Sequence, residues 1–384
     1  MKVGMVGFRG IPHTYSGNEE FVRHVAPRLA ARGHEVIVYC RSGHFRHDRR
    51  PTWKGVRRVF LPTIEHKSGG MFIHAALAMS AAVREKVDLV YVHTLPSAPH
   101  TLLPWLFRVP VVVNMDGLEW KRAKWGFVGK QYFKRARDIA LFTSDEIVND
   151  SQVLVDYYRR EHHRDSTFIA YGADLCYPGP TELLDRFGLR SGEYYLVASR
   201  LVPENSADKV IEAYRRAGTS RPLVIAGSAN YKSTWVDDVM RSASDQIRFV
   251  GHIADPGDVV QLHCHAFAYL HGHTVGGTNP SLVKAMGCGN CIIAFDSPFN
   301  REVLTGNDGR IHGFMFQTTE ELQAVFELLE AQPELASDKG SRVRGRAFEA
   351  YSWDSIADGY EALFSRVLRR RRATSGLEVE SLGD

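Results

Sequence analysis

Short apolar segments alternate with amphipathic segments through the first half of the chain. Residues 18–32 place Phe21, Val25 and Leu29 four positions apart, which predicts a helix with one buried face. Further helices are expected near 70–85, 97–107 and 146–160. The apolar segments predict strands at Val3–Phe8, Glu35–Cys40, Val59–Leu61, Leu89–His93, Val109–Asn114 and Leu141–Thr143. Apolar strands separated by helices are typical of a parallel sheet covered on both faces.

A break in this alternation falls at residues 171–180, where glycine and proline interrupt the pattern. Beyond it the pattern predicts a second series of strands, at Tyr195–Ser199, Leu223–Ala226, Ile247–Val250, Ala266–Leu270 and Cys291–Phe295. The helices of this half are expected near 205–216, 233–243, 256–264, 280–287, 319–331, 335–350 and 353–372. The chain is therefore predicted to be an α/β protein with two doubly wound domains, at 1–175 and 176–352. The helix 353–372 is expected to pack back towards the first domain, and the polar residues 373–384 to form a disordered tail.

The composition indicates where the protein is located and how its charge is distributed. At 44% hydrophobic and 24% charged residues, the chain resembles an ordinary soluble protein. No apolar run approaches the roughly 20 residues of a membrane-spanning helix, and the start MKVGMVGF lacks the features of a signal peptide. We therefore expect a cytoplasmic protein. Residues 1–180 carry an excess of Lys and Arg, so the first domain is the one suited to an anionic partner.

The five cysteines do not form a disulfide framework, because they are few and scattered over a long chain. Cys288 and Cys291 have CxxC spacing, but no second CxxC or paired histidine motif completes a zinc site. We interpret them as small buried residues between a helix and a strand, with metal or redox use as the alternative.

The first strand is followed by a long loop that contains Gly7, Gly10 and Gly17. With Gly4, the spacing is G-x-x-G-x-x-G rather than the G-x-G-x-x-G of dinucleotide sites, and no acid follows the second strand. A helix beginning near Ser16 and Gly17 would instead direct free N–H groups at a phosphate or sugar oxygen. An ordinary surface loop is the alternative.

The segment 271–286 contains the strongest single signal. Here a strand ends, Gly276 and Gly277 permit close backbone approach, Thr278 or Asn279 can cap a helix, and a proline suits its first turn. Such a turn can cradle a diphosphate. A lysine at position 284 opposes the helix dipole unless a bound anion compensates, so Lys284 is either a donor contact or a solvated side chain.

Arginine and histidine side chains follow two strands of this second domain. Arg200 ends one strand and is predicted to clamp a diphosphate and offset the charge of the leaving group, with a surface arginine as the alternative. His271 and His273 lie on one side of another strand's end and are candidate ligand contacts. Together with His263 and His265 they match no known metal spacing, so we expect no metal site.

Two acids of the first domain follow a strand end. Asp116 or Glu119 could accept a hydrogen bond or a proton from a hydroxyl acceptor, and Glu119 could equally cap the next segment. We favour Asp116 for the catalytic role. Glu119 and His93, which ends another strand, are candidate contacts for the acceptor or sugar.

Residues 121–137 mix basic and aromatic side chains. Such a stretch could lie on anionic lipid head groups or hold a lipid-phosphate acceptor, which would place the protein peripherally on the inner face of the cell membrane. Nucleic-acid binding is not expected, because no recognised motif accompanies the basic residues. A solvated basic helix face remains the alternative.

These motifs together resemble the retaining nucleotide-sugar glycosyltransferases of family 4, and especially a bacterial rhamnosyltransferase-like branch. The similar segments cover roughly residues 1–365 in order. They begin at Gly7–Gly17 and Ala31–Val36, and continue at Asp116–Gly126, Tyr171–Asp174, Arg200–Asn205, His271–Pro280 and Asp296–Glu302.

The resemblance implies a GT-B fold, in which two Rossmann-like doubly wound domains face one another across a cleft. It implies a donor diphosphate on the second domain, a glycan or lipid-linked acceptor on the first, transfer with retention, and no required metal or cofactor. By the same resemblance Gly17 lines the phosphate side, Arg200 contacts the diphosphate, and residues 276–279 cradle it. Asp116 stands where many relatives have a histidine. The branch favours dTDP-rhamnose or a UDP-sugar as donor, and synthesis of a bacterial cell-surface polysaccharide or glycolipid.

The sequence also departs from the family. Gly276 and Lys284 occupy the two positions of its E-x7-E signature, and Asn205 replaces the lysine that follows the arginine clamp. In the family the second glutamate binds the nucleotide ribose, so its absence leaves the identity of the nucleotide open. The missing lysine weakens the diphosphate site unless Lys284 substitutes for it. These changes keep open a nucleotide-sugar epimerase and a degenerate, non-catalytic sugar-nucleotide-binding subunit as alternatives.

Overall fold

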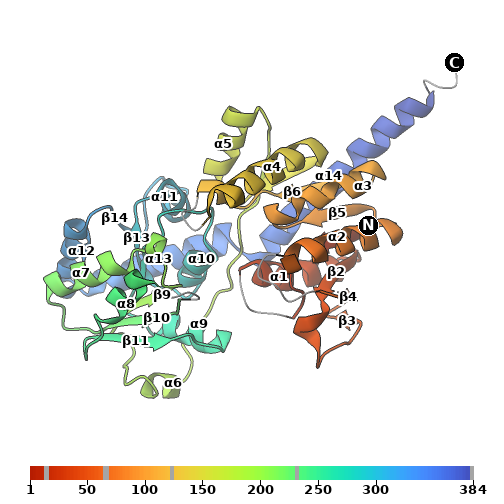
Figure 1. Ribbon diagram of the computed structural model, residues 1–384. Coiled ribbons are helices and arrows are strands. Elements are labelled where there is room, and N and C mark those ends of the chain that lie inside the picture. The colour runs from red at the N-terminus through yellow and green to blue at the C-terminus, as the bar shows by residue number, and fades with distance from the viewer. Residues whose placement is uncertain (13–16, 64–68, 122–124, 230–232, 381–384) are drawn as a thin grey trace. The chain divides into compact units, whose positions relative to one another are not determined.

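The computed structural model describes residues 1–12, 17–63, 69–121, 125–229 and 233–380 (Figure 1). The chain divides into two compact units. The N-terminal unit comprises Met1–Ala170 and Trp353–Asp384, and the C-terminal unit comprises Tyr171–Ser352. The division after Ala170 lies five residues before the boundary expected from the sequence.

The N-terminal unit is built on an eight-stranded sheet with the order β3-β4-β2-β1-β5-β6-β7-β8. All neighbours pair in parallel except β3 and β4. The strands are β1 (Lys2–Val6), β2 (Glu35–Arg41), β3 (Thr52–Trp53), β4 (Val56–Leu61), β5 (Leu89–Val92), β6 (Val111–Asn114), β7 (Glu146–Asn149) and β8 (Thr167–Phe168). The helices are α1 (Gly17–Ala31), α2 (Gly69–Arg84), α3 (Leu102–Leu106), α4 (Phe127–Thr143), α5 (Gln152–His162) and α14 (Trp353–Glu380), with short 3-10 turns at Ser42–Phe45, Leu95–Thr101 and Glu119–Lys121.

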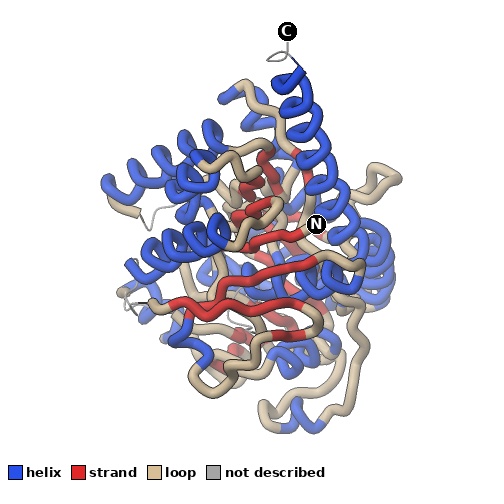
Figure 2. Tube along the Cα trace, turned by 90° about the vertical axis from the view of Figure 1, so that its right-hand side faces the viewer, coloured by secondary structure: helices blue, strands red, loops and turns tan. Residues whose placement is uncertain are grey.

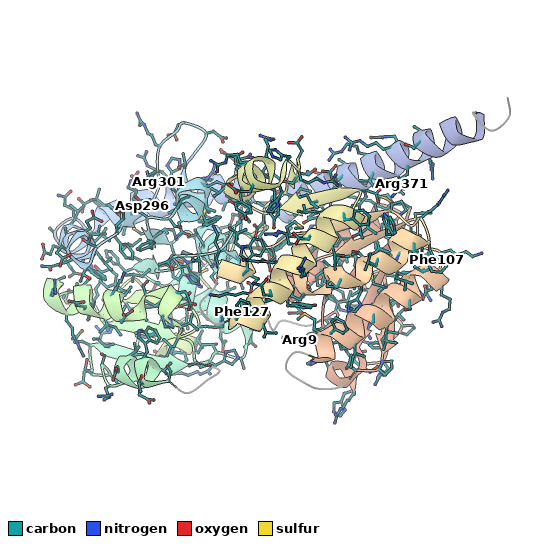
Figure 3. All side chains as sticks on the ribbon, turned by 45° about the horizontal axis from the view of Figure 1, so that its top comes forward. Arg9, Phe107, Phe127, Asp296, Arg301 and Arg371 are labelled. Carbon is teal, nitrogen blue, oxygen red and sulfur yellow. The ribbon has the colours of Figure 1, made fainter. Side chains whose placement is uncertain are left out.

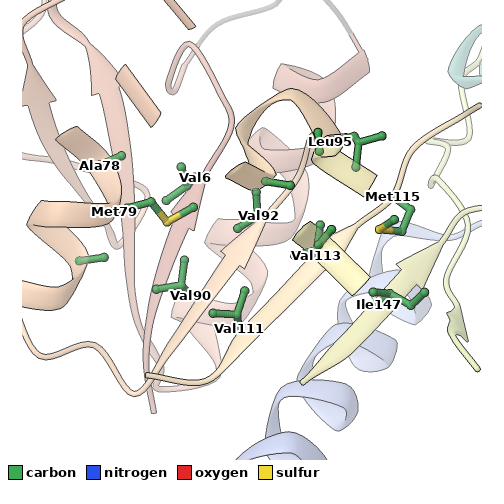
Figure 4. Close-up of a cluster of buried hydrophobic side chains, with 14 of the residues drawn as sticks. Val6, Ala78, Met79, Val90, Val92, Leu95, Val111, Val113, Met115 and Ile147 are labelled. Carbon is green, nitrogen blue, oxygen red and sulfur yellow. The ribbon is translucent and has the colours of Figure 1, made fainter. Parts of the chain in front are cut away.

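Burial on both faces explains why the central strands consist almost entirely of apolar residues. The β5 sequence LVYV and the β6 sequence VVVN are buried at every position. Figure 4 shows Val90, Val92, Val111 and Val113 packed with Met79 of α2 in one apolar cluster. This core holds the strands in register, and the polar loops begin at the carboxyl ends of these strands.

One predicted strand is wrong. Residues Leu141–Thr143 form the last turn of α4, and the strand is β7, which begins three residues after Thr143. The residues at both ends of β7 are polar, so the hydrophobic pattern did not indicate this strand. Glu146 is buried, and its carboxylate lies 3.4 Å from the Arg370 guanidinium of α14. The helix expected from residue 146 accordingly begins only at Gln152, where the Ser151 side chain caps it.

The C-terminal helix α14 packs against α1 within the N-terminal unit. Asp354 accepts a hydrogen bond from Arg28 at 2.8 Å, and Glu361 contacts both Arg32 and His34 at 3.1 and 2.7 Å. Further along, Tyr360 is buried and its hydroxyl lies 3.1 Å from that of Tyr91 on β5. The helix continues to Glu380, so it includes most of the segment expected to be a tail (Figure 2).

The C-terminal unit carries a six-stranded parallel sheet with the order β11-β10-β9-β12-β13-β14. Its strands are β9 (Tyr195–Ala198), β10 (Leu223–Ala226), β11 (Ile247–Gly251), β12 (Ala268–His271), β13 (Cys291–Phe295) and β14 (Phe314–Phe316). Its helices are α6 (Glu182–Asp185), α7 (Ala207–Ala217), α8 (Thr234–Met240), α9 (Pro256–Cys264), α10 (Pro280–Gly287), α11 (Pro298–Leu304), α12 (Thr319–Ala331) and α13 (Glu334–Ala350), with a 3-10 turn at Pro203–Asn205. Two doubly wound α/β domains are therefore confirmed.

The strand order reverses once in each sheet. In the N-terminal unit the chain runs outward from β1 through β2, then returns to place β5 on the other side of β1. In the C-terminal unit β10 and β11 extend one way from β9, and β12 lies on its other side. Ligands of open α/β sheets bind outside the carboxyl ends of the strands at such reversals, so ligand sites are expected at β1–β5 and β9–β12.

Candidate active site

Two loops meet at the β9–β12 reversal. Because β9 and β12 are parallel neighbours, their carboxyl ends lie at one edge of the sheet. The loop after β9 contains Arg200 and the 3-10 turn Pro203–Asn205, and the loop after β12 leads to α10. Glu204 accepts two hydrogen bonds at its carbonyl oxygen from Thr274, one from the backbone N–H at 3.0 Å and one from the hydroxyl at 3.1 Å. The two loops are therefore joined into one structure.

The backbones of the two loops lie very close together at this junction. A Cβ on Gly272 would lie 2.3 Å from the carbonyl oxygen of Asn205, so only glycine fits there. Asn205 is buried, and its side-chain amide donates to the Arg200 carbonyl oxygen at 2.8 Å. The asparagine that replaces the expected lysine thus holds the Arg200 loop in place.

The Arg200 side chain itself is exposed at this edge. Within the described parts of the chain, no acidic group or carbonyl oxygen pairs with its guanidinium. Arg301 differs, because its guanidinium is paired with Asp296 (Figure 3). Arg200 is therefore available to an anion at the carboxyl end of β9.

Helix α10 begins beside these residues with a complete cap. The Asn279 side chain accepts from the backbone N–H of Ser281 at 2.9 Å, and Pro280 occupies the first helical position. Thr278 is buried, whereas a Cβ on Gly276 would meet nothing within 4 Å. Gly276 has a φ of +141°, a conformation that favours glycine. The turn 276–279 thus leaves open space in front of a helix N-terminus, where an anion is stabilised.

His271 and His273 stack on one another just before this turn. Their ring centroids are 4.1 Å apart, and the His271 Nδ1 lies 3.1 Å from the Tyr269 hydroxyl. Burial and the neighbouring histidines hold the pKa of His271 well below its usual range, so the ring stays neutral. The buried Nε2 of His271 has no hydrogen-bond partner among the residues that the structure describes.

His263 and His265 form hydrogen bonds that stabilise the fold. His263 bonds to Asn290 through its ring at 3.0 Å, and His265 lies 2.9 Å from the Ser191 hydroxyl and 3.1 Å from the Gly179 carbonyl oxygen.

Lys284 lies on α10, one turn beyond the cap, and is half-buried. No carboxylate among the described residues forms an ion pair with its ammonium group. Burial lowers the pKa of His263, and the nearby charge of Lys284 lowers it further.

Glycines also bring loops together at the β1–β5 reversal of the N-terminal unit. A Cβ on Gly7 would lie 3.1 Å from the Thr94 hydroxyl, and one on Gly10 would lie 2.6 Å from the Cys40 sulfur. Both have positive φ values. Gly17 begins α1, and the buried Glu19 carboxylate of its first turn accepts from the Arg9 N–H at 3.0 Å. Ser16, the other predicted contact, lies outside the described residues.

Asp116 and Glu119 follow β6, next to β5. Asp116 has a φ of +54°, and its carboxylate accepts from the Gly117 N–H at 2.8 Å, so it is held rigidly in a turn. The Glu119 side chain is buried and accepts from the Trp125 indole at 2.9 Å. Glu119 therefore anchors the segment before α4, whereas Asp116 is half-buried and reaches the surface.

His93 follows β5 and is buried between two aromatic rings. Its centroid lies 4.9 Å from that of Phe8 and 4.3 Å from that of Phe21, and its Nδ1 lies 2.8 Å from the Tyr91 hydroxyl. With 1% of its surface exposed, it packs behind the Gly7 loop. This packing favours a role in positioning that loop over direct contact with an acceptor.

Both units match families of known function. Residues 16–171 match the glycosyl transferase 4-like domain, and residues 185–346 match glycosyl transferases group 1. This chain is a glycosyltransferase. No curated protein matches its sequence significantly.

Solved structures share the fold of the glycosyltransferase over nearly its whole length. HepE of Anabaena, solved with UDP, is 16% identical with a TM-score of 0.76, and the match covers 95% of this chain and 100% of HepE. Sucrose-phosphate synthase of Thermosynechococcus elongatus is also 16% identical at 0.76, covering 96% and 99%. The catalytic domain of starch synthase IV from Arabidopsis thaliana, bound to ADP and acarbose, is 13% identical at 0.74, covering 96% and 99%. The fold class is therefore GT-B, as predicted.

The structure adds one residue that sequence reasoning did not assign to the site of the glycosyltransferase. Asn300 of α11 is buried, and its amide donates to the His273 carbonyl oxygen at 2.9 Å and to the Phe295 carbonyl oxygen at 2.8 Å. It therefore ties the exit of β13 to the loop after β12. Its place in the segment Asp296–Glu302, one of those that resemble family 4, was the available signal.

Lowering the pH is expected to destabilise the N-terminal unit of the glycosyltransferase through His93. Burial lowers the pKa of His93 to about 3, whereas an unfolded histidine titrates near 6.5. Below pH 6.5 the unfolded chain takes up a proton that the folded chain does not, so the free energy of unfolding decreases as pH falls from 6.5 towards 3. His93 alone should cost about 2 kcal/mol between pH 6.5 and 5.

Chemical denaturation at pH 6.5 and pH 5 measures this loss. His93→Phe should reduce the difference between the two pH values, and a substitution at the exposed His47 is the control. Equal pH dependence in His93→Phe and the wild type would contradict the assignment.

Proposed function

We propose that the enzyme transfers a sugar from a nucleoside diphosphate donor held by the C-terminal unit to a hydroxyl acceptor held by the N-terminal unit. One observation carries the proposal: the Arg200 guanidinium, which has no partner in the described part of the chain, and the capped N-terminus of α10 belong to two loops that are bonded together at the β9–β12 reversal. A cation and a helix N-terminus at the same sheet edge suit a diphosphate.

The same two groups supply the chemistry of the first step. When the glycosidic bond to the diphosphate breaks, negative charge accumulates on the leaving group. A guanidinium and aligned backbone N–H groups stabilise that charge without the reorganisation that water would need. We propose that this replaces a metal ion, and that the acceptor hydroxyl attacks from the face that the leaving group vacates, with retention.

Asp116 is the proposed group for the acceptor. It follows β6 in a rigid turn, and its carboxylate is half-buried. A carboxylate there can accept a hydrogen bond from the acceptor hydroxyl and orient it for attack.

The donor is proposed to be a UDP-sugar or dTDP-rhamnose. HepE of Anabaena was solved with UDP-glucose as well as UDP, which supports a uridine or thymidine nucleotide. Resemblance to the rhamnosyltransferase-like branch of family 4 supports rhamnose, and a role in bacterial cell-surface polysaccharide or glycolipid synthesis.

A screen of nucleoside diphosphates by thermal shift tests the donor site, because a ligand that binds only the folded state raises its Tm. UDP, dTDP, GDP and ADP are the probes, and at least one should raise Tm without added metal. A donor sugar should then be transferred to an acceptor at a rate above its hydrolysis. Turnover of the donor with no acceptor would indicate an epimerase, and binding without turnover would indicate a non-catalytic subunit.

Lys284→Ala is expected to weaken binding of the stabilising diphosphate roughly tenfold. The ammonium has no carboxylate partner among the described residues, and a hydrogen bond to a charged group contributes about 1.5–3 kcal/mol. Calorimetric titration measures the change, with Lys339→Ala on α13 as the matched control. Unchanged affinity and turnover in Lys284→Ala would show that Lys284 does not replace the missing glutamate or lysine.

We further propose that α4 lies against an anionic membrane, which would present a lipid-linked acceptor to the N-terminal unit. Phe127, labelled in Figure 3, and Val128 lie at the start of α4 and are 77% and 81% exposed. Lys134 and Arg135 are exposed on the same helix. Apolar side chains beside basic ones suit the interface of a membrane with anionic head groups. Among the described residues, no helix is both long and apolar enough to cross the membrane.

The double variant Phe127→Ser, Val128→Ser should bind vesicles of phosphatidylglycerol at least tenfold more weakly than the wild type, because two apolar side chains no longer enter the interface. Co-sedimentation with vesicles is the measurement. Phe348→Ser on α13, where the side chain is 65% exposed, is the matched control. Equal binding by the double variant, or no preference for phosphatidylglycerol over phosphatidylcholine, would refute the membrane contact.

A further inference from the structure

Positive charge is concentrated where β2 ends in the N-terminal unit. Residues 41–50, which we call the basic loop, begin at the last residue of β2 and lead towards β3. They contain four arginines and a single acid, namely Arg41, Arg46, Arg49, Arg50 and Asp48. Like charges held so close together repel one another, and a bound anion relieves that repulsion.

Arg58 of β4 holds the basic loop in one conformation. Its side chain is buried, and its guanidinium lies 3.0 Å from the Asp48 carboxylate. It also donates to the Arg50 carbonyl oxygen at 2.8 Å and to the Ile11 carbonyl oxygen at 3.0 Å. The guanidinium carbon lies 4.9 Å from the centroid of the Phe60 ring. Breaking a buried ion pair of this kind is strongly destabilising, so the loop is fixed on the end of the sheet.

The carboxylate of the basic loop is already occupied, whereas two of its guanidinium groups are not. Asp48 accepts from the Arg50 guanidinium at 2.8 and 3.0 Å, besides the buried ion pair. Arg49 donates to neutral oxygens, the hydroxyl and the carbonyl of Ser42, each at 3.2 Å. Over the described ranges, no carboxylate pairs with Arg46 or Arg49, and both side chains are exposed. Both can therefore bind an anion from solvent.

The basic loop lies at the edge of the sheet where ligands of the N-terminal unit are expected. The Arg41 N–H donates to the carbonyl oxygen of Arg9 at 2.8 Å, and a Cβ on Gly10 would lie 2.6 Å from a ring carbon of Phe45. The basic loop is thus joined to the glycine loop after β1. Strands β2, β1, β5 and β6 are consecutive neighbours, and Asp116 follows β6. At roughly 4.8 Å between parallel strands, the ends of β2 and β6 are about 14 Å apart.

We propose that Arg46 and Arg49 bind an anionic group of the acceptor, a phosphate, diphosphate or carboxylate. The inference rests on the proposed function, in which the N-terminal unit holds the acceptor and Asp116 orients its reacting hydroxyl. Guanidinium groups bind phosphate and carboxylate through two parallel N–H bonds. Because the basic loop and Asp116 stand at strand ends about 14 Å apart, the charged group and the reacting hydroxyl belong to different parts of the acceptor. The acceptor is therefore larger than a single phosphorylated sugar.

A membrane surface fits the basic loop less well than an anionic acceptor does. Among the described residues of this loop, no large apolar side chain is exposed, and Phe45 is buried. Peripheral binding to a bilayer uses apolar side chains beside basic ones, as proposed for α4. The basic loop offers charge alone, which suits a discrete anionic group.

Inorganic pyrophosphate is the probe for this site, because it carries neither a lipid nor a sugar. The C-terminal unit is also proposed to hold a diphosphate, so calorimetric titration is carried out in full-length enzyme with Arg200→Ala and Lys284→Ala. Pyrophosphate should still bind, and the further changes Arg46→Ala and Arg49→Ala should weaken its binding roughly tenfold or more. Unchanged affinity after these two changes would overturn the proposal.

A matched pair of arginines controls for the general loss of charge. Arg159→Ala with Arg160→Ala removes the same charge from exposed positions on α5 of the same unit, and should leave pyrophosphate binding unchanged. An equal loss of affinity in this control would show that the effect of the basic loop is not specific. The titration needs no donor, so it decides the anion site even if no sugar transfer is found.

Transfer assays with the identified donor then test whether the anion belongs to the acceptor. The acceptors are an oligosaccharide linked to a lipid through a diphosphate, an oligosaccharide containing a uronic acid, and a neutral oligosaccharide. Arg46→Ala with Arg49→Ala should raise the KM for one of the two anionic acceptors roughly tenfold, with little change in kcat or in the KM for the neutral one. Which KM rises identifies the source of the charge.

Two results of these assays would overturn the assignment. Equal changes in KM for the neutral and the anionic acceptors would show that the basic loop does not recognise charge on the substrate. Weaker binding of the Arg46→Ala, Arg49→Ala variant to vesicles of phosphatidylglycerol, with pyrophosphate affinity intact, would make the basic loop a membrane contact instead.

Discussion

Arg200→Ala is expected to lower the kcat of sugar transfer by roughly 10²–10³. The guanidinium is exposed at the carboxyl end of β9 with no described partner, so its charge is available to the leaving diphosphate. Charge on that group is larger in the transition state than in the bound donor, and the loss should therefore appear mainly in kcat. Steady-state kinetics with the donor identified by thermal shift provide the measurement.

Two further variants make the result specific. Arg200→Lys keeps a positive charge but loses the two-pronged contact of the guanidinium, so its kcat should lie between those of the wild type and the alanine variant. Arg190→Ala removes a side chain that is 84% exposed in the same unit and should have no effect. If Arg200→Ala folds normally and retains kcat within about threefold, Arg200 does not stabilise the leaving group.

Gly272→Ala is expected to destabilise the C-terminal unit by roughly 3 kcal/mol, which corresponds to a fall in Tm of about 6–12 °C. Its added Cβ would stand 2.3 Å from the Asn205 carbonyl oxygen, and both partners are backbone, so neither can turn aside. The junction between the Arg200 loop and the loop after β12 must open. Donor affinity should fall together with stability, because both diphosphate-binding groups depend on that junction.

Gly345→Ala is the matched control for this effect. Gly345 lies within α13 of the same unit, a Cβ there meets nothing within 4 Å, and alanine is a better helix former than glycine. Its Tm should stay the same or rise slightly. An unchanged Tm in Gly272→Ala would mean that the two loops are not held together as described.

The sequence pattern was sufficient for most of the architecture because the central strands are apolar throughout. Helices α10 and α12 begin and end where the pattern placed them, since a proline or a capping threonine marks each start. The pattern failed at β7, where Glu146 is buried by pairing with arginines of α14, more than two hundred residues later. No local reading of hydrophobicity could anticipate that tertiary contact.

The candidate site likewise has features that the sequence indicates and contacts that it does not. Arg200 and the turn 276–279 are identifiable from sequence, because strand ends, glycines and caps are local features. The bonds that bring them together are not local: Thr274 reaches Glu204, and Asn300 reaches His273. Likewise, the burial of His93 depends on Phe8 and Phe21 from other segments, so the sequence suggested a contact with the acceptor or sugar that this packing does not favour.

The path of the chain through its two units has a consequence for synthesis on the ribosome. The chain enters the C-terminal unit at Tyr171 and leaves it after Ser352. The entering and leaving segments are adjacent, because the Ala173 N–H donates a hydrogen bond to the Tyr351 carbonyl oxygen. All of the C-terminal unit is therefore translated before α14, the helix that covers α1. A nascent chain can complete its second unit while the first still exposes an apolar helix face, so the unit that begins the protein is the last to be finished.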